Sequence, residues 1–376
     1  MKIAYLLSWD LGLEDGVVKK VLTQVAEWSK HECEVRIFCV SKSDSKLKHP
    51  VAVPISYFER RASQNLINEF LSVSRAYKKV IDALKDFAPD MIYLRSETYQ
   101  PLLGKIMDSY PTIVELNTNE AAELSLRSNE NFKARARFFY LKPLISKYYS
   151  KAAGFICVTY ELAKSSEIQK TNKPVMVIPN SIRLKDFQCN HVNDNARAKL
   201  VFIGSPDQKW HGVDEIIKLA ELTTESLDFE IIGLENSFNS VPSNVRFHGF
   251  KKRDEYQRIM CASDIGLGVM GLHRKNMTEA CSLKVREYLA FGLPVINGHQ
   301  DTAFVGKKLP EFILQVPNEE GALSRHKDKV LDFIGRMKGK RLSASEVEEY
   351  IDVGIWEAKK VDFFKRIASS VNKDFS

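Results

Sequence analysis

Two glutamates and a lysine in the second half of the chain have types and spacing that could bind a phosphorylated ligand. Glu279 and Glu287 are eight positions apart, and Lys284 stands between them. The apolar positions of 282–291 predict a helix that ends at Gly292. The free N–H groups and positive dipole end of such a helix favour a bound phosphate. Lys284 would add a positive charge there, and Glu287 could accept hydrogen bonds from two ribose hydroxyls.

The alternative interpretation of this stretch is an ordinary amphipathic helix. In that case Lys284 and Glu287 would form an ion pair on its solvated face. Glu279 would then be an unremarkable acid in the loop that precedes the helix.

A second polar turn, residues 204–214, follows an apolar strand that ends at Gly204-Ser205 and precedes a helix from Gly212. Lys209 and His211 are its basic residues. Lysine is fully charged at neutral pH and histidine mostly is not, so Lys209 is the expected phosphate contact. His211 could instead hydrogen-bond, or pack against Trp210.

Apolar strands alternate with amphipathic helices through both halves of the chain, and this order positions the two turns. Uninterrupted apolar strands are typical of parallel sheets that are covered on both faces. The 376 residues are enough for two domains of ordinary size. We therefore expect an α/β fold with two doubly wound Rossmann-like domains that face each other across a central cleft. The polar stretch 189–198 is the expected linker.

The pattern Ser-Leu-Lys-x-x-Glu-Tyr-x-Ala-x-Gly-x-Pro-Val over 282–295 resembles the Glu-x7-Glu region of the family-4 glycosyltransferases, which are retaining enzymes of the GT-B fold. Val-Ile-Pro-Asn at 177–180 resembles their inter-domain junction, and Ser263-Asp264 resembles a step before one of their strands. The resemblance implies an N-terminal acceptor-binding domain of 1–185 with a returning helix of 357–376. It implies a nucleotide-sugar-binding domain of 186–356.

The resemblance also implies roles for single residues. Glu279 would contact the donor sugar near the reacting carbon, and Lys209 and Lys284 would stabilise the charge of the leaving diphosphate. The implied contacts to the nucleotide sugar are Gly16, Gly204, Ser205, His211, Ser282, Leu283, Lys284 and Glu287. The expected activity is transfer of a sugar, of the hexosyl type, from a nucleotide-diphosphate-sugar donor to a glycan or lipid-linked acceptor, as in surface polysaccharide biosynthesis. The chain has no Asp-x-Asp, so we expect a metal-independent enzyme without a further cofactor.

The first domain departs from the family pattern at two places. Gly16 fits the second glycine of the family's Gly-Gly loop, but Asp15 replaces the first. A histidine is common in relatives after the strand that ends at 117, and none is present here. Asn117 or Glu120 is the candidate for its place on the acceptor side, because ligands bind at the carboxyl ends of parallel strands. The alternative is a helix cap with first-turn acids.

Residues 127–151 are the most basic region, with aromatic residues interleaved. A basic amphipathic helix of this kind can lie on an anionic bilayer, which would suit a lipid-linked acceptor. The alternative is that the aromatic residues belong to the core and the basic residues face water.

The bulk composition excludes several classes of protein. The net charge of +7 fits anionic ligands such as nucleotide diphosphates, while no nucleic-acid motif is present. No apolar run is long enough for a membrane span, and the N-terminus predicts a first strand, so we expect a cytoplasmic protein, with peripheral contact at the inner face of the membrane as an option. The six cysteines have no metal-ligand spacing, and several stand in apolar strands as small hydrophobes.

Two other functions are compatible with parts of the pattern. A nucleotide-sugar epimerase on the same fold would bind a donor but no second sugar, and the Lys284/Glu287 pattern argues against it. A two-lobed sugar-binding protein without catalysis would usually be exported, and the missing signal peptide argues against that.

Overall fold

The computed structural model describes residues 1–374 except for 14, 43–44, 48–49, 62–65, 97–100, 119–143, 188 and 190–193. The chain divides into two compact units. Unit 1 contains 1–178 and 353–376, and unit 2 contains 179–352. These boundaries lie seven and four residues before the 185 and 356 expected from the sequence.

Unit 1 is built on a seven-stranded sheet in the order β3-β2-β1-β4-β5-β6-β7. Every pair of neighbouring strands is parallel. The strands are β1 (Lys2–Ser8), β2 (Glu34–Ser41), β3 (Ile55–Glu59), β4 (Met91–Arg95), β5 (Thr112–Leu116), β6 (Gly154–Cys157) and β7 (Val175–Val177).

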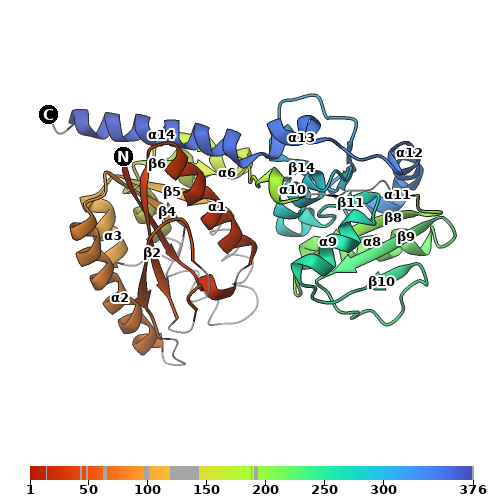
Figure 1. Cartoon of the computed structure of the whole chain (residues 1–376), viewed down its shortest axis with the longest axis horizontal. Helices are drawn as coiled ribbons and strands as arrows, with labels where there is room; N and C mark the ends of the chain where they lie inside the picture. The colour runs from red at the N-terminus through yellow and green to blue at the C-terminus, as the bar shows by residue number, and fades with distance from the viewer. Residues whose placement is uncertain are drawn as a thin grey trace. The chain divides into compact units, whose positions relative to one another are not determined.

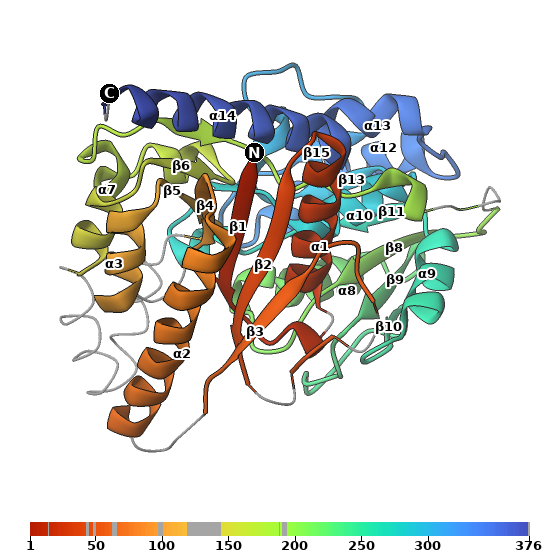
Figure 2. The same ribbon diagram turned by 60° about the vertical axis from the view of Figure 1, so that its left-hand side comes forward.

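Helices cover both faces of this sheet. The ring of Tyr5 on β1 stacks on Trp28 of α1, and Trp28 meets Phe364 of α14 edge to face. Helices α1 and α14 thus share one face (Figure 2). Helix α2 covers the opposite face (Figure 1). There, Phe38 of β2 packs against Phe87 at the end of α2. The helices of unit 1 are α1 (Gly16–Lys30), α2 (Leu66–Phe87), α3 (Pro101–Ser109), α6 (Tyr160–Ala163), α7 (Ser166–Gln169) and α14 (Val353–Asp374).

Unit 2 repeats this plan with a six-stranded parallel sheet in the order β10-β9-β8-β11-β13-β15. Its strands are β8 (Ala198–Ile203), β9 (Leu227–Ile232), β10 (Val245–Phe247), β11 (Ile265–Leu267), β13 (Val295–Asn297) and β15 (Ile313–Gln315). A separate small pair joins β12 (Glu279–Ala280) to β14 (Gln300–Asp301).

The two faces of the unit 2 sheet also carry separate cores. Phe202 of β8 packs with Ile216 and Phe333, while Val201, the next residue back, packs with Tyr288 and Met260. The prediction of two doubly wound parallel sheets is therefore confirmed. The helices are α8 (Val213–Glu221), α9 (Arg253–Cys261), α10 (Leu283–Ala290), α11 (Ala322–Arg325), α12 (Lys327–Met337) and α13 (Ala344–Ile351), with short 3-10 turns that include η3 (Lys209–His211) and η4 (Leu272–Lys275).

Two of the six cysteines form a disulfide bond. Cys189 lies inside unit 2, at the start of the stretch 189–198 that the sequence indicated as a linker, and it is bonded to Cys261, the last residue of α9. The other four cysteines are free and buried, as expected for small hydrophobes. The sequence offered no sign of the pair, because 72 positions separate its members.

The region considered for membrane contact lies mostly outside the described residues, which resume at 144. In the described part, 144–150 is helical, and Tyr148 and Tyr149 are buried. Among the helices that the structure describes, none combines the length and apolar character needed to cross a bilayer.

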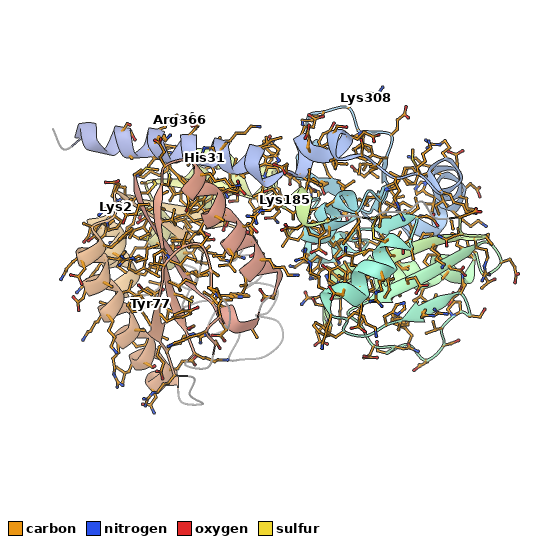
Figure 3. All side chains as sticks on the ribbon, in the orientation of Figure 1. Lys2, His31, Tyr77, Lys185, Lys308 and Arg366 are labelled. Carbon is orange, nitrogen blue, oxygen red and sulfur yellow. A yellow bond between two sulfur atoms is a disulfide. The ribbon has the colours of Figure 1, made fainter. Side chains whose placement is uncertain are left out.

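Side chains such as Tyr77 of α2 fill the interior of unit 1 (Figure 3).

Candidate functional site

Helix α10 carries the predicted phosphate-binding residues and begins one residue after the predicted start. Ser282 is its N-cap in an extended conformation, and among the described contacts its side chain makes no capping hydrogen bond. The first-turn N–H groups, those of Leu283 and Lys284 among them, have no carbonyl partner within the helix. They are therefore available to an anion at this end of α10.

The side chain of Lys284 ends in a buried ammonium group that forms no ion pair with any described carboxylate. Its Nζ atom is inaccessible to solvent and has no hydrogen-bond partner among the residues that the structure describes. It lies 4.1 Å from the centroid of the Phe202 ring, at the end of β8. Burial lowers the pKa of Lys284 to about 7. The alternative of a surface ion pair with Glu287 is therefore wrong, because this ammonium is buried and Glu287 does not accept its hydrogen bonds.

Gly204 and His211 also lie against the Phe202 ring. A side chain at Gly204 would begin 2.6 Å from that ring and 3.0 Å from Nδ1 of His211, so this position has no room for one. His211 is buried, and its ring packs edge to face on Trp210 and Phe202. Burial, followed by the charges of Lys284 and Lys275, lowers the pKa of His211 to about 3. His211 is thus neutral at physiological pH, and its Nδ1 has no partner in the described part of the chain.

Lys209 is exposed on the η3 turn, together with Ser205 upstream of it. The turn is braced through its backbone, since Arg274 of η4 donates a hydrogen bond to the carbonyl oxygen of Lys209 at 2.9 Å. Gly212 adopts φ +70° where η3 ends, and a Cβ there would lie 2.7 Å from the backbone nitrogen of Gly271. The close approach of the two turns explains why glycine stands before α8.

Lys275 is a residue of this region that the sequence analysis missed. Its Nζ lies 4.7 Å from the centroid of the Trp210 ring, and its charge acts on His211. The only sequence signal is the basic run 273–275 after the apolar β11, which no motif of the family marked.

Three carboxylates near η4 come within 4.8 Å of one another, the spacing of a metal site: Asp214, Glu215 and Glu320. Basic side chains already neutralise them. Arg274 donates to both oxygens of Asp214, at 2.8 and 2.7 Å, and to Glu320. Lys218 donates to Glu215 at 2.8 Å. The cluster is thus an ion-pair network that fixes η4 beside α8.

The two glutamates of the motif lie on different elements. Glu279 is buried in the short strand β12, where the sequence analysis expected a loop. Pairing of β12 with β14 explains the difference, since neither two-residue strand is recognisable alone. Glu287 lies half-buried on α10. Burial of Tyr256 is the main cause of its raised pKa, and the negative charge of Glu287 raises that pKa further. The Glu287 carboxylate therefore lies near the Tyr256 phenol. Arg286, which lies between the two glutamates in the sequence, is fully buried. It forms an ion pair with Asp301 of β14 and so connects α10 to this strand.

In unit 1, Gly16 is the first residue of α1. The Asp15 carboxylate accepts hydrogen bonds from the backbone nitrogens of Val17 and Val18 at 2.9 and 3.0 Å. The residue that replaces the family's first glycine is therefore a helix cap, and it occupies N–H groups that a phosphate would need. Asn117 follows β5 and accepts a hydrogen bond from Lys20 at 2.7 Å. Glu120 lies outside the described residues.

Taken together, the structure brings Gly204, His211 and Lys284 around one aromatic ring, beside the start of α10. An uncompensated ammonium next to free backbone N–H groups can bind and stabilise an anionic group. Lys209 lies on the neighbouring turn, whereas Gly16 and Asn117 belong to unit 1.

Comparison with known proteins gives structural matches only. No family model matches the chain, and no curated protein matches it by sequence. Sucrose-phosphate synthase from Thermosynechococcus elongatus has a TM-score of 0.72 at 12% identity, covering 98% of this chain and 99% of that one. A glycosyltransferase from Rickettsia africae has a TM-score of 0.65 at 13% identity, covering 97% and 98%. HepE from Anabaena, in complex with UDP and glucose, has a TM-score of 0.61 at 14% identity, covering 97% and 100%. The chain therefore has the GT-B fold.

Proposed function

We propose that this protein is a retaining glycosyltransferase, which moves a sugar from a nucleotide-diphosphate-sugar donor to a glycan or lipid-linked acceptor. The observation that carries the proposal is the buried, unpaired ammonium of Lys284 at the start of α10. Keeping an uncompensated charge in the interior costs free energy. An anionic ligand that binds there would remove this cost, and a diphosphate is an anion of suitable charge.

The structural matches support a nucleotide sugar as that ligand. HepE was solved with UDP and glucose, and an alpha-glucosyltransferase that matches with a TM-score of 0.63 was solved with UDP. Fold likeness at this identity does not transfer an activity by itself. It does make UDP and UDP-glucose the first ligands to test.

In the proposed mechanism, negative charge develops on the leaving diphosphate. Lys284, the N–H groups at Ser282 and Leu283, and Lys209 would stabilise it. Glu287 would hold the ribose, Glu279 would contact the donor sugar, and the backbone at Gly204 and Ser205 would line the same site. Unit 2 would then bind the donor and unit 1 the acceptor.

Two finer features belong to the same proposal. The stabilisation of the leaving group rests on the protein's own cations, so we propose a reaction that needs no metal. We also propose a cytoplasmic enzyme of surface polysaccharide synthesis, with 127–151 as its contact to a membrane-borne acceptor. In the described part of that region Ile145, Tyr148 and Tyr149 are buried and only polar residues such as Lys147 are exposed, so the aromatic part of the contact would come from the residues before 144.

The test is a donor screen in the presence of a chelator. UDP-, GDP- and ADP-sugars would be incubated with the protein, and the melting temperature and the release of nucleoside diphosphate would be measured together. We expect one donor to raise the melting temperature and to be slowly hydrolysed, with water taking the sugar in place of the acceptor. Both effects should disappear in Glu287→Gln and Lys284→Met.

A matched control is Lys308→Met, which removes an exposed lysine of unit 2 (Figure 3). It should bind and turn over the donor like the wild type. If no nucleotide sugar changes the melting temperature, the glycosyltransferase proposal fails. Turnover that stops when the chelator is added would overturn metal independence alone.

A further inference from the structure

Polar side chains lie at the carboxyl ends of two neighbouring strands of unit 1, β4 and β5. Strands β1, β4 and β5 are adjacent and parallel, so they end at one edge of the sheet. Arg95 is the last residue of β4, and Asn117 directly follows β5. Ligands of doubly wound sheets bind outside this edge. Asn117 is half-buried there.

A buried lysine from the helix behind the sheet holds Asn117. The Nζ atom of Lys20, on α1, lies 2.7 Å from Oδ1 of Asn117 and 2.9 Å from Oε1 of Glu115. The side chain of Lys20 is 8% exposed and that of Glu115 1%. The guanidinium of Arg95 donates to the other oxygen of Glu115 at 3.3 Å. The asparagine is thus the outer end of a buried, charged network.

This network continues inward to α14. Gln24 of α1 donates to both Glu115 and Glu357, and Trp28 donates to Glu357 at 2.7 Å. Lys360 donates to Glu357 at 2.9 Å. Each inner member therefore has its partners inside unit 1. Asn117 is the member that stands at the ligand-binding edge.

The chemistry of the lysine decides which way the amide faces. An ammonium group has three donors and no acceptor, so Asn117 must turn its oxygen toward Lys20. Its NH2 group then points away from the network. No described residue accepts a hydrogen bond from that NH2 group. A side-chain amide that could otherwise rotate by half a turn is thereby fixed as a donor at this edge.

We propose that Lys20 is a positioning residue, which fixes Asn117 so that its amide N–H group donates a hydrogen bond to an oxygen of the acceptor sugar. The inference rests on the proposed glycosyltransferase function and adds a requirement to it. The substrate group at this edge accepts a hydrogen bond, as a hydroxyl or ring oxygen does. A group that can only donate is not recognised there.

Asn117→Asp separates the two roles of the amide. The aspartate oxygen still accepts the hydrogen bond from Lys20, so the network and the melting temperature should be kept. The N–H donor is lost and a negative charge takes its place. We expect the release of nucleoside diphosphate from the donor found in the screen, measured as kcat/KM for an added acceptor glycan, to fall at least tenfold. The affinity for free nucleoside diphosphate should stay within twofold.

A double-mutant cycle tests the positioning role of Lys20. Lys20→Met with Glu115→Gln removes one positive and one negative charge together, so that the net charge of the network is unchanged, and Asn117→Ala removes the amide. If Lys20 acts through Asn117, adding Asn117→Ala to this paired variant should reduce kcat/KM less than twofold further. In the wild-type background the same change should reduce it at least tenfold.

The outcomes separate this inference from the proposed function. Wild-type protein that turns over no nucleotide sugar overturns both. Turnover by the wild type with an Asn117→Asp variant within twofold of it overturns the inference alone. So does a cycle in which the effects on kcat/KM simply multiply, since Lys20 would then be merely structural. If the paired variant does not fold, the Asn117→Asp comparison decides.

Discussion

The Nζ atom of Lys284 lies 4.1 Å from the centroid of the Phe202 ring, and no described residue accepts a hydrogen bond from it. A cation over an aromatic face is stabilised by the ring quadrupole, by about 0.5–2 kcal/mol. That is less than the cost of burying an ammonium without an acceptor. Lys284 is therefore held at an energetic disadvantage in the free protein, which an anionic ligand would relieve.

Replacing Lys284 by methionine should change stability and ligand affinity in opposite ways. Methionine fills a similar volume without a charge, so we expect the free energy of unfolding to rise by about 1–3 kcal/mol. The affinity for nucleoside diphosphate should fall at least tenfold. Urea unfolding and a calorimetric titration measure the two effects. A variant that loses stability, or that binds like Lys308→Met, would contradict the assigned role.

The lowered pKa of Lys284 predicts how stability depends on pH. Its pKa is about 7 in the folded protein against 10.5 for the free side chain. Between these values the unfolded chain binds the extra proton, so the free energy of unfolding should rise with pH there, by up to about 1.4 kcal/mol per pH unit. The melting temperatures of wild type and Lys284→Met, measured from pH 6.5 to 9.5, should therefore approach each other as the pH rises.

The same titration should act on ligand affinity with the opposite sign. Diphosphate binding favours the protonated lysine, so the affinity should weaken as the pH rises above about 7. Lys284→Met should lack this pH dependence. An equal slope in both proteins would show that another group is responsible.

Glu115 should be the acid-sensitive group of unit 1. Burial by itself would raise the pKa of this carboxyl, but Lys20, Lys360 and Arg95 together hold it well below its usual range. The ionised Glu115 carboxylate contributes to the free energy of unfolding when the pH is above 4.5, the ordinary pKa of a glutamate. This contribution is lost as the pH falls below 4.5. Glu115→Gln strands the buried cations and should cost about 3–5 kcal/mol near neutral pH.

The paired variant with Lys20→Met is the control for Glu115→Gln. It removes a cation together with the carboxylate, so it should recover most of the lost free energy of unfolding. Urea unfolding followed by tryptophan fluorescence at pH 7 measures both. If the single and the paired variant lose the same free energy of unfolding, the loss comes from altered packing and not from the unbalanced charge.

The disulfide bond between Cys189 and Cys261 should stabilise unit 2. It closes a loop with a sequence separation of 72, and removing such a bond typically costs about 2–4 kcal/mol. A reductant should therefore lower the melting temperature of the wild type but not that of Cys189→Ser/Cys261→Ser. Thiol labelling of the unreduced, unfolded protein should modify four cysteines. Modification of all six would contradict the bond.

The sequence was sufficient wherever the signal is local. Apolar strands in alternation with amphipathic helices predicted both parallel sheets, and the spacing of 282–291 predicted α10 to within a residue at each end. It also predicted that His211 packs on Trp210 as one of two alternatives. These features depend on residues within a few turns of one another, so their pattern is visible in one dimension.

The tertiary structure alone decided what surrounds those residues. Lys284 is buried rather than paired with Glu287 because β8 brings the Phe202 ring beneath it. Glu279 lies in a strand because β14 returns beside it. The order of β1, β4 and β5 in the sheet brings Lys20 to Asn117, and no pattern along the chain marks that pair. The type of each residue and its local pattern can be read from the sequence. Its burial and charge balance depend on neighbours that only the folded chain brings close.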